Sequence, residues 1–507
     1  MLNRFRQVVN NVMANMPQNR ALKGGMDEDE ITNGLQEKYS YTRPEFLQLS
    51  SEEVSIASDS VIRPIMVPRD LSKLPWHSGY SEVMNGGKSK HNEDQAAAGH
   101  FVLKGHNHEK MAVGEEGKPS IGDPDDIPMT YFAVFDGHAG TGASLMSVNT
   151  LHYQILDKLD RVYELLVNST LEQRQFSRKG DLRPYKWPFI EKEVSIESLV
   201  TGALEATFVD MDNQIKDEKQ YYAISGGCTA LVALFLLGKL YIANAGDSRA
   251  IICKGSEVIP MSTDFNPVTE RQRVQYLATI KPELVNTEFT PLEFQKRVHR
   301  RDLGKRVMCR DASMTGWTYK EVLEDDLRFP LVFGEGKKAR LLATIGVTRG
   351  FGDHDLKVHG TDIAIKPFLS PVPEVRVYDL FDQDHSENDV LVMATDGLWD
   401  ILSNEKVFEI VREVLQSFPP GDYKRYASAG QELIMAARGI LKTNGWRTKD
   451  GRLGSGDDIT VFIIPLCHHR GLSPQNSITE SQDASGTSPD SPENQNAPSS
   501  LPHEGAV

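Results

Sequence analysis

Short apolar runs that end in polar turns dominate the middle of the chain, and they predict strands. Residues 131–135 form a mostly apolar run, typical of a covered strand, and this run stops at Asp136. Further runs, rich in β-branched and aromatic residues, are residues 228–237, 239–246, 249–254, 389–396 and 459–465. The first two of these meet at Gly238 in a hairpin-like turn, so this part of the sheet is expected to be antiparallel.

Other segments repeat their apolar residues at helical spacing. This pattern predicts helices from Ala143, from Asn404 and over residues 426–442. At the N-terminus, residues 1–16 place leucine, valine, phenylalanine and methionine on one face, which predicts an amphipathic helix within residues 1–20. This helix could lie on a membrane surface or dock on the protein's own core.

Composition suggests how the remaining chain is organised. Residues 21–75 are mostly polar and are interpreted as a linker and connecting segment before one large domain, residues 76–467. Residues 262–340 are irregular, charged and partly helical, and are interpreted as an insertion in that domain. Residues 468–507 contain almost no aliphatic side chains, so a disordered tail is expected.

Charge and cysteine usage narrow the function classes. The 507-residue chain has a net charge of -15, which argues against a general nucleic-acid binder. Its four cysteines are far apart and lack C-x-x-C spacing, so neither a zinc site nor a disulfide framework is predicted. No apolar run approaches the roughly 20 residues of a spanning helix, and no secretory signal is visible. We therefore expect a cytoplasmic protein, with peripheral contact to an internal membrane as the alternative for the N-terminal helix.

Several aspartates stand at the predicted strand ends or strand-to-strand turns: Asp136, Asp247, Asp396 and Asp457. Each alone could be an ordinary turn or helix-capping residue. Together, carboxylates that converge without matching cations would repel one another and raise their own pKa values, and divalent cations remove that conflict. Mg²⁺ and Mn²⁺ favour oxygen ligands, and Gly137 would let a backbone carbonyl approach such an ion.

The chain resembles a known family on seven motifs that occur in order. These are "HNEDQ" (91–95), "DGHAG" (136–140), "GGCTA" (226–230), "NAGDSR" (244–249), "VTRGFGD" (347–353), "ATDGLWD" (394–400) and "GSGDDITV" (454–461). They are similar to the motifs of the metal-dependent PPM, or type 2C, protein serine/threonine phosphatases. The N-terminal helix and the long insertion are most similar to the H/J/M branch, and to its J member in particular.

The resemblance implies an α+β fold in which two mainly antiparallel sheets form a β-sandwich flanked by helices, with residues 262–340 as the flap. It implies hydrolysis of phosphoserine and phosphothreonine with two Mg²⁺ or Mn²⁺ ions. Asp136 would bridge the ions, and the other positions that match metal-site residues are the Gly137 carbonyl, Asp396, Asp457, Glu93 and, behind them, Asp94. Asp247 matches a ligand of a third, weaker site shared with Asp396, and Asp458 stands where the family usually has asparagine.

The chemistry of such a site can be derived from general principles. Two ions about 4 Å apart lower the pKa of a bridging water and orient it for attack on phosphorus. The leaving alkoxide needs a proton, and His138, two residues after Asp136, is placed to supply it. A lone histidine is more often structural, but its adjacency to Asp136 favours the catalytic interpretation.

The motif around Glu93 departs from the family pattern, which has a phosphate-binding arginine four residues before the glutamate. Here that position is Ser89, and lysines flank it at Lys88 and Lys90. Lys88 is the predicted phosphate contact, with Lys90 as the alternative. Lysine binds phosphate as a point charge and cannot form the bidentate fork of arginine, so substrate affinity or choice could differ.

The flap contains a strongly basic stretch, residues 296–310, in an otherwise acidic protein. This stretch could recruit an acidic or phosphorylated protein surface, or it could be a solvated helix face. Members of the H/J/M branch are associated with phosphorylated Rab-type small GTPases, so such a GTPase is one hypothesis for the substrate. The alternatives to an active enzyme are a phosphoprotein-binding pseudophosphatase and a membrane-bound scaffold.

Overall fold

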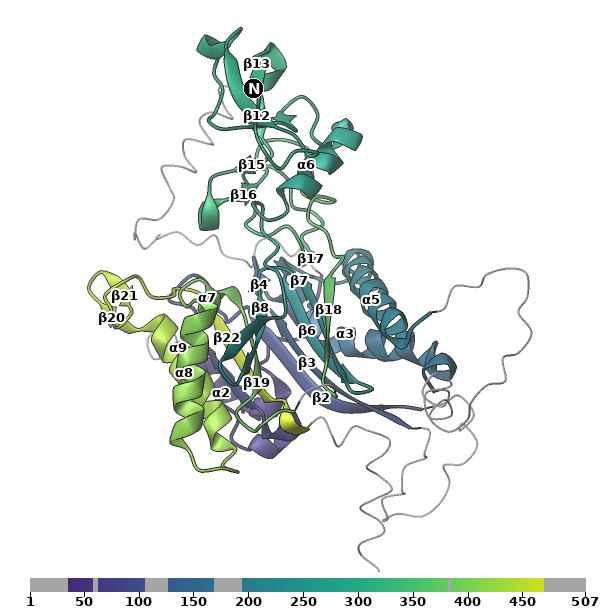
Figure 1. Cartoon of the computed structure of the whole chain (residues 1–507), viewed down its shortest axis with the longest axis vertical. Coiled ribbons are helices and arrows are strands. Elements are labelled where there is room, and N and C mark those ends of the chain that lie inside the picture. Colours follow the sequence, from purple (N-terminus) through teal and green to yellow (C-terminus); the bar gives the residue numbers. More distant parts are fainter. Residues whose placement is uncertain (1–34, 58–62, 105–125, 168–193, 382–383, 469–507) are drawn as a thin grey trace, which may run out of the picture.

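The computed structural model describes residues 35–57, 63–104, 126–167, 194–381 and 384–468. The predicted N-terminal helix and all but the first residue of the predicted tail lie outside these described residues. Two five-stranded antiparallel sheets form the centre of the molecule (Figure 1). One has the strand order β1 (Gly79–Val83), β22 (Ile459–Pro465), β19 (Val390–Ala394), β8 (Arg249–Lys254) and β9 (Glu257–Pro260). The other has the order β18 (Glu374–Asp379), β7 (Lys239–Ala245), β6 (Ala230–Leu236), β3 (Ile127–Phe135) and β2 (Gln95–Leu103).

Strand β3 shows why the sheets stack in this way. Its residues are buried on both faces, so alternate side chains enter two different cores. Phe132 and Val134 pack in the core between the two sheets. Tyr131, Ala133 and Phe135 pack against the helices α3 (Gly142–Asp160) and α5 (Ile196–Glu218).

The other sheet is covered in the same manner by α8 (Asn404–Ser417) and α9 (Lys424–Arg438), which share a core with β19 and β22. The layers are therefore helix, sheet, sheet and helix, and the predicted fold class is confirmed. The predicted helix over residues 426–442 is wrong at its end, because α9 stops at Arg438 and β20 (Ile440–Lys442) pairs with β21 (Gly445–Arg447). Gly439 makes this turn with a φ of 71°, and a Cβ there would lie 2.0 Å from the Arg447 carbonyl oxygen.

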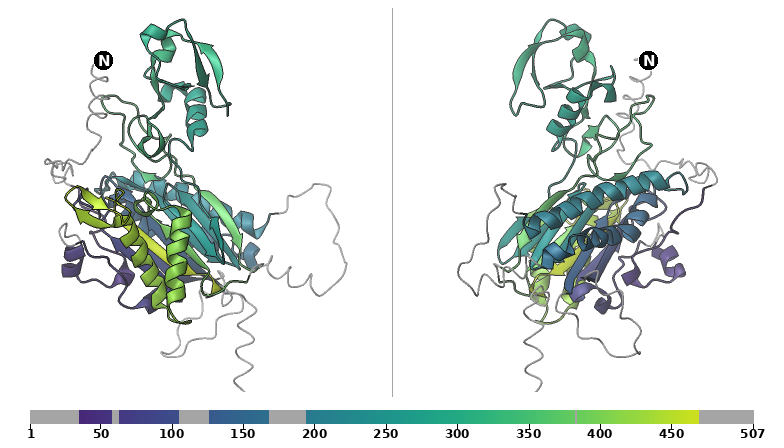
Figure 2. Two further views of the ribbon diagram at one scale, coloured as in Figure 1. Left: turned by 60° about the vertical axis from the view of Figure 1, so that its left-hand side comes forward. Right: turned by 90° about the vertical axis from the view of Figure 1, so that its right-hand side faces the viewer.

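The flap projects from one end of the sandwich (Figures 1 and 2). It has a hydrophobic core of its own, which includes Phe289, Phe329 and Leu341 and continues beyond residue 340 to Ile365 and Phe368. Its elements are α6 (Arg271–Ile280), β10 (Phe289–Thr290), β11 (Glu293–Phe294), β12 (Arg306–Arg310), β13 (Thr318–Glu321), β14 (Phe329–Pro330), β15 (Val332–Phe333) and β16 (Arg340–Leu341). The basic stretch, residues 296–310, is not one helix face, because it runs through a loop, the 3₁₀ helix η7 (Arg300–Asp302) and strand β12.

Part of the predicted connecting segment packs on the sandwich. Leu47 is fully buried, and the short helix α2 (Ser51–Ala57) follows it. Arg43 forms a buried bidentate ion pair with Glu82 of β1, with Nε–Oε1 and Nη2–Oε2 distances of 2.8 and 2.6 Å. Arg43 Nη1 also donates to the carbonyl oxygens of Asn92 and Asp94, at 3.2 and 2.7 Å. The segment therefore supports the backbone on either side of Glu93.

Replacing Arg43 by methionine is expected to lower the free energy of unfolding by about 3–5 kcal/mol, because Glu82 would be left buried without its partner. Urea unfolding followed by circular dichroism measures this change. The exposed pair of Arg69 and Glu53 provides the matched control, since water and salt screen it. An Arg69→Met variant that loses as much stability as Arg43→Met would contradict the expectation.

Among the described residues, no helix combines the length and the apolar composition that crossing a membrane requires. The four cysteines are free thiols, and three of them are buried.

Candidate active site

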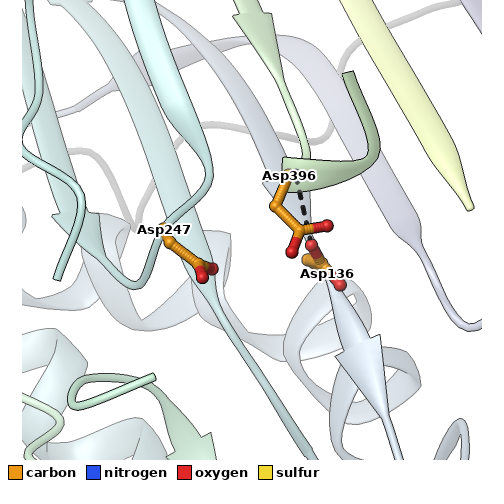
Figure 3. A group of neighbouring side chains, drawn as sticks. All are labelled: Asp136, Asp247 and Asp396. Atoms are coloured by element: carbon orange, nitrogen blue, oxygen red, sulfur yellow. Dashed lines mark hydrogen bonds between the residues drawn. The ribbon is translucent and has the colours of Figure 1, made fainter. Parts of the chain in front are cut away.

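Strands that are distant in sequence bring three aspartates together at one end of the sandwich (Figure 3). Asp136 follows β3, Asp247 lies in the turn between β7 and β8, and Asp396 begins the short helix α7 (Asp396–Trp399) after β19. Each offers a carboxylate oxygen within 4.8 Å of the other two. The backbone nitrogen of Asp396 also donates to Asp136 Oδ2 at 3.3 Å.

The cluster is electrostatically strained without a cation. Burial, and then the charges of the neighbouring carboxylates, raise the pKa values of Asp136 and Asp247 well above the usual aspartate value. The same causes raise the pKa of Asp396 to about 7. A compact set of oxygen donors with this repulsion fits a hard divalent cation such as Mg²⁺ or Mn²⁺.

The backbone beside Asp136 is packed so closely that only glycine fits. A Cβ on Gly137 would lie 2.3 Å from the carbonyl oxygen of Glu93. The close approach of the two backbones places Glu93 at the end of β3. There, Glu93 Oε1 accepts a hydrogen bond from the Gly140 nitrogen at 2.6 Å. The structure therefore places Glu93 and Gly137 side by side at the candidate metal site.

Asp94 is buried one residue further along the chain. Its Oδ2 accepts from the hydroxyl groups of Thr395 and Thr460, at 2.9 and 2.8 Å. These threonines lie at the site end of β19 and in β22, so Asp94 ties both strands to the start of β2. Burial, and then the charge of Asp458, raise its pKa well above the usual value.

Lys88 reaches the carboxylates from the loop between β1 and β2, as an ion pair with Asp457. Burial alone would lower the pKa of Lys88, but Asp457, Asp396 and Asp136 outweigh this effect and raise it. The Lys88 side chain remains 60% exposed, so its ammonium group is accessible to an incoming anion. Of the predicted metal-site residues, Asp457 therefore lies at the rim, beside the predicted phosphate contact.

His138 is held by a residue to which the sequence assigned no role. Its Nε2 lies 2.7 Å from Asp353 Oδ2, which is buried. A small sheet makes this contact, since β4 (Gly137–His138) pairs with β5 (Gly227–Cys228), and β5 pairs with β17 (Phe351–Gly352). Burial would lower the pKa of His138, but the hydrogen bond and charge of Asp353 raise it.

Comparison with known proteins places the chain in a family. The sequence profile of the protein phosphatase 2C family matches residues 98–279 and 332–438. The chain belongs to this family, and it is a metal-dependent protein serine/threonine phosphatase.

Relatives of two kinds have similar levels of identity. Protein phosphatase 1H of Xenopus tropicalis is 48% identical over 487 residues, covering 88% of this chain and 96% of the relative. Protein phosphatase 1H of Homo sapiens is 47% identical, covering 86% of this chain and 93% of the relative. Protein phosphatase 1J of Homo sapiens is also 47% identical, covering 88% of this chain and 89% of the relative. These identities support the predicted H/J/M branch through its H and J members, which match the chain at similar levels.

When divalent cations are removed with a chelator, the free energy of unfolding is expected to fall as the pH rises. Asp396 titrates near 7 in the folded protein and near 4 in an unfolded chain, so the folded state binds more protons between these values. The free energy of unfolding then decreases with rising pH, by ~2 kcal/mol or more between pH 5 and 7.5. Urea unfolding in EDTA measures this slope, and Mn²⁺ should flatten it. A slope that Mn²⁺ leaves unchanged would contradict the assignment of the cluster.

Proposed function

We propose that the chain hydrolyses phosphoserine and phosphothreonine in proteins, using divalent cations held by Asp136 and its neighbours. The observation that carries this proposal is the cluster of Asp136, Asp247 and Asp396 at the strand ends. The other proposed metal-site residues are the Gly137 carbonyl, Glu93, Asp94 and Asp457. When bound, two Mg²⁺ or Mn²⁺ ions, with a weaker third at Asp247 and Asp396, would supply an activated water and neutralise charge on the phosphoryl group.

The remaining roles fall to side chains of this protein. Lys88 binds and orients the substrate phosphate from the rim of the site as a point charge. His138 donates a proton to the leaving serine or threonine oxygen. Asp353 keeps the imidazole in place through the contact between its Oδ2 and His138 Nε2.

Phosphate release from a phosphothreonine peptide, measured with and without Mn²⁺, tests this proposal. Metal-dependent release that is lost in Asp136→Ala supports it. A folded protein that binds Mn²⁺ and phosphoproteins but releases no phosphate would favour the pseudophosphatase alternative. The presence of all the cluster carboxylates argues against that alternative.

For the substrate, we propose an acidic or phosphorylated protein surface, with a phosphorylated Rab-type small GTPase as the specific hypothesis. The flap exposes a group of cations that would suit such a surface: Lys296, Arg297, Arg300, Arg301, Lys305 and Arg306. Two exposed aromatic rings stack with cations of the same flap: Arg306 lies over Tyr319, which is 61% exposed, and Arg310 lies over Trp317, which is 43% exposed. The flap also contacts the end of helix α7, which begins at Asp396, since Lys337 Nζ lies 3.0 Å from an Asp400 carboxylate oxygen.

Reversing the charge of basic flap residues tests whether the flap binds the substrate without taking part in catalysis. The double variant Lys296→Glu and Arg301→Glu is expected to raise KM for a phosphorylated GTPase about tenfold and to leave hydrolysis of a short phosphopeptide unchanged. Lys73→Glu with Lys216→Glu is the matched control, because these exposed lysines lie on the sandwich. Equal losses in both double variants would refute a docking role for the flap.

We further propose that the protein is cytoplasmic and contacts an internal membrane through residues 1–20. The support is the sequence pattern of that segment, with two arginines that favour anionic lipid. Sedimentation of the full chain with anionic vesicles tests the idea, with Phe5→Glu as the variant. Vesicle binding that persists in the variant would refute it, and docking on the protein's own core would remain the explanation.

A further inference from the structure

The loop that carries Lys88 is built around a buried pair, Asn85 and Asp458. Asn85 is fully buried and Asp458 is 5% exposed. Asn85 follows β1, and Asp458 lies between the rim residue Asp457 and strand β22. The pair therefore joins the loop after β1 to the chain segment that provides the candidate metal ligand Asp457.

Asp458 faces hydrogen-bond donors. Its Oδ1 accepts from the backbone nitrogen of Asn85 at 2.7 Å, and its Oδ2 accepts from the backbone nitrogen of Glu93 at 3.2 Å. Asn85 Nδ2 donates to the same two oxygens at 3.2 and 3.3 Å. An asparagine side chain here would turn its NH₂ group toward at least one of these donors. The aspartate that departs from the family pattern thus matches the donors around it.

Asn85 in turn organises the loop backbone. Its Oδ1 accepts from the nitrogens of Gly87, Lys88 and Ser89, at 3.0, 2.7 and 3.2 Å. Its Nδ2 also donates to Ser89 Oγ at 2.8 Å and to the His91 carbonyl at 3.2 Å. These partners fix the orientation of the amide, since the oxygen faces backbone donors and the nitrogen faces acceptors.

Two arginines bind the backbone on both sides of the contact between Asn85 and Asp458. Arg63 Nε donates to the Asn85 carbonyl at 2.7 Å. Arg438 Nη2 donates to the carbonyl oxygens of Met84 and Asp457, at 2.8 and 2.6 Å. The backbone that carries Lys88 is therefore fixed from the Asp457 side as well as from within the loop.

We propose that Asn85 and Asp458 are positioning residues, which fix the Lys88 backbone so that its ammonium group stays at the phosphate side of the metal site. Lysine has a long flexible side chain and lacks the planar fork of arginine. A fixed backbone reduces the freedom that this side chain loses when it binds phosphate. The inference rests on the proposed phosphate contact of Lys88.

The first test is Asn85→Ala in the full chain loaded with Mn²⁺. We expect the affinity for inorganic phosphate, measured by calorimetry, to fall about tenfold, in line with the effect of misplacing a charged contact. KM for a phosphothreonine peptide should rise by a similar factor, while kcat falls less. Mn²⁺ affinity should stay within about twofold of the original value, because the cluster keeps its ligands. Asp458→Asn should shift phosphate affinity in the same direction, and it serves as the second variant if Asn85→Ala does not fold.

A double-mutant cycle with Lys88→Ala separates the role of the pair from the phosphate contact of Lys88. If the pair acts through Lys88, adding Asn85→Ala to Lys88→Ala changes phosphate affinity by less than about twofold. Additive losses, or an equal loss of Mn²⁺ affinity, would overturn the positioning role while leaving the phosphatase proposal intact. A Lys88→Ala variant with unchanged phosphate affinity would overturn the Lys88 contact and this inference with it.

Asp389 provides the matched control. It is also a buried carboxylate that accepts from backbone nitrogens, those of Gly255 at 2.9 Å and Ser386 at 2.7 Å. It lies just before β19, at the end of that strand opposite Asp396. Asp389→Asn is expected to lower the melting temperature without changing phosphate affinity. A loss of phosphate affinity equal to that of Asp458→Asn would refute a specific role for the pair.

Discussion

Replacing Asp136 by asparagine is expected to lower the rate of hydrolysis severely and, at the same time, to make the cation-free protein more stable. Catalysis should fall because this carboxylate is one of the three in the cluster that would hold the cations. Cations contribute several kcal/mol of charge stabilisation in the transition state, which corresponds to a loss on the order of 10³-fold in kcat. Mn²⁺ affinity should fall together with the rate.

The gain in stability follows from the sign of the pKa shift. The pKa of Asp136 is raised in the folded protein, so its ionised form is less favourable there than in the unfolded chain. At pH 7.5 in EDTA, removing that charge should increase the free energy of unfolding by ~1–3 kcal/mol. In saturating Mn²⁺ the order should reverse, because only the original protein gains from strong binding.

Two measurements on the same variants decide this prediction. Thermal unfolding in EDTA and in Mn²⁺ gives the stability, and phosphate release from a phosphothreonine peptide gives the rate. Asp389→Asn is the control for loss of a buried carboxylate outside the cluster, and it should destabilise the protein in both conditions. An Asp136→Asn variant that is less stable in EDTA would mean that Asp136 is a structural acceptor.

The site residues that stand at the ends of strands could be predicted from the sequence. Apolar runs ending in Asp136 and Asp396 gave both the strands and their terminal carboxylates, and the structure brings these two together with Asp247. Alternation could not be used to orient β3, because it is buried on both faces. The resemblance to a family supplied the sandwich, but the order of the strands in the two sheets is known only from the structure.

The contacts that orient the functional side chains could not be predicted in the same way. Asp353 meets His138 only through the pairing of β4, β5 and β17, each of which is two residues long and shows no periodicity. Asn85 resembles an ordinary turn residue until the seven hydrogen bonds of its side chain are seen in the fold. Likewise, the ion pair of Arg43 with Glu82 joins a polar segment to a strand, and composition alone favoured a linker.

The roles proposed for the two sides of the site differ, and this difference has a measurable consequence. We propose that Lys88 and the cluster face the phosphate; His138 lies on the small sheet after β3, and Asp353, which pairs with it, directly follows strand β17. A group that protonates the leaving oxygen matters only when that oxygen leaves poorly as an anion. Substrates with different leaving groups therefore separate the proposed roles.

Replacing His138 by glutamine is expected to lower kcat/KM for a phosphothreonine peptide by about 10²–10³-fold, as for loss of a general acid. For p-nitrophenyl phosphate, whose phenolate leaves readily, the loss should be less than about tenfold. Asp353→Asn should show the same preference with a smaller loss, because it removes the partner charge of His138 but keeps a hydrogen-bonding side chain. Steady-state rates with both substrates at saturating Mn²⁺ give these ratios.

His152→Gln is the matched control, since this histidine lies on α3, packed against Phe101 and Tyr131. It should change stability without separating the two substrates. If His138→Gln lowered both rates equally, the histidine would act on the phosphate or the cations. If it lowered neither rate, proton supply to the leaving group would have to come from solvent, and the contact with Asp353 would be structural.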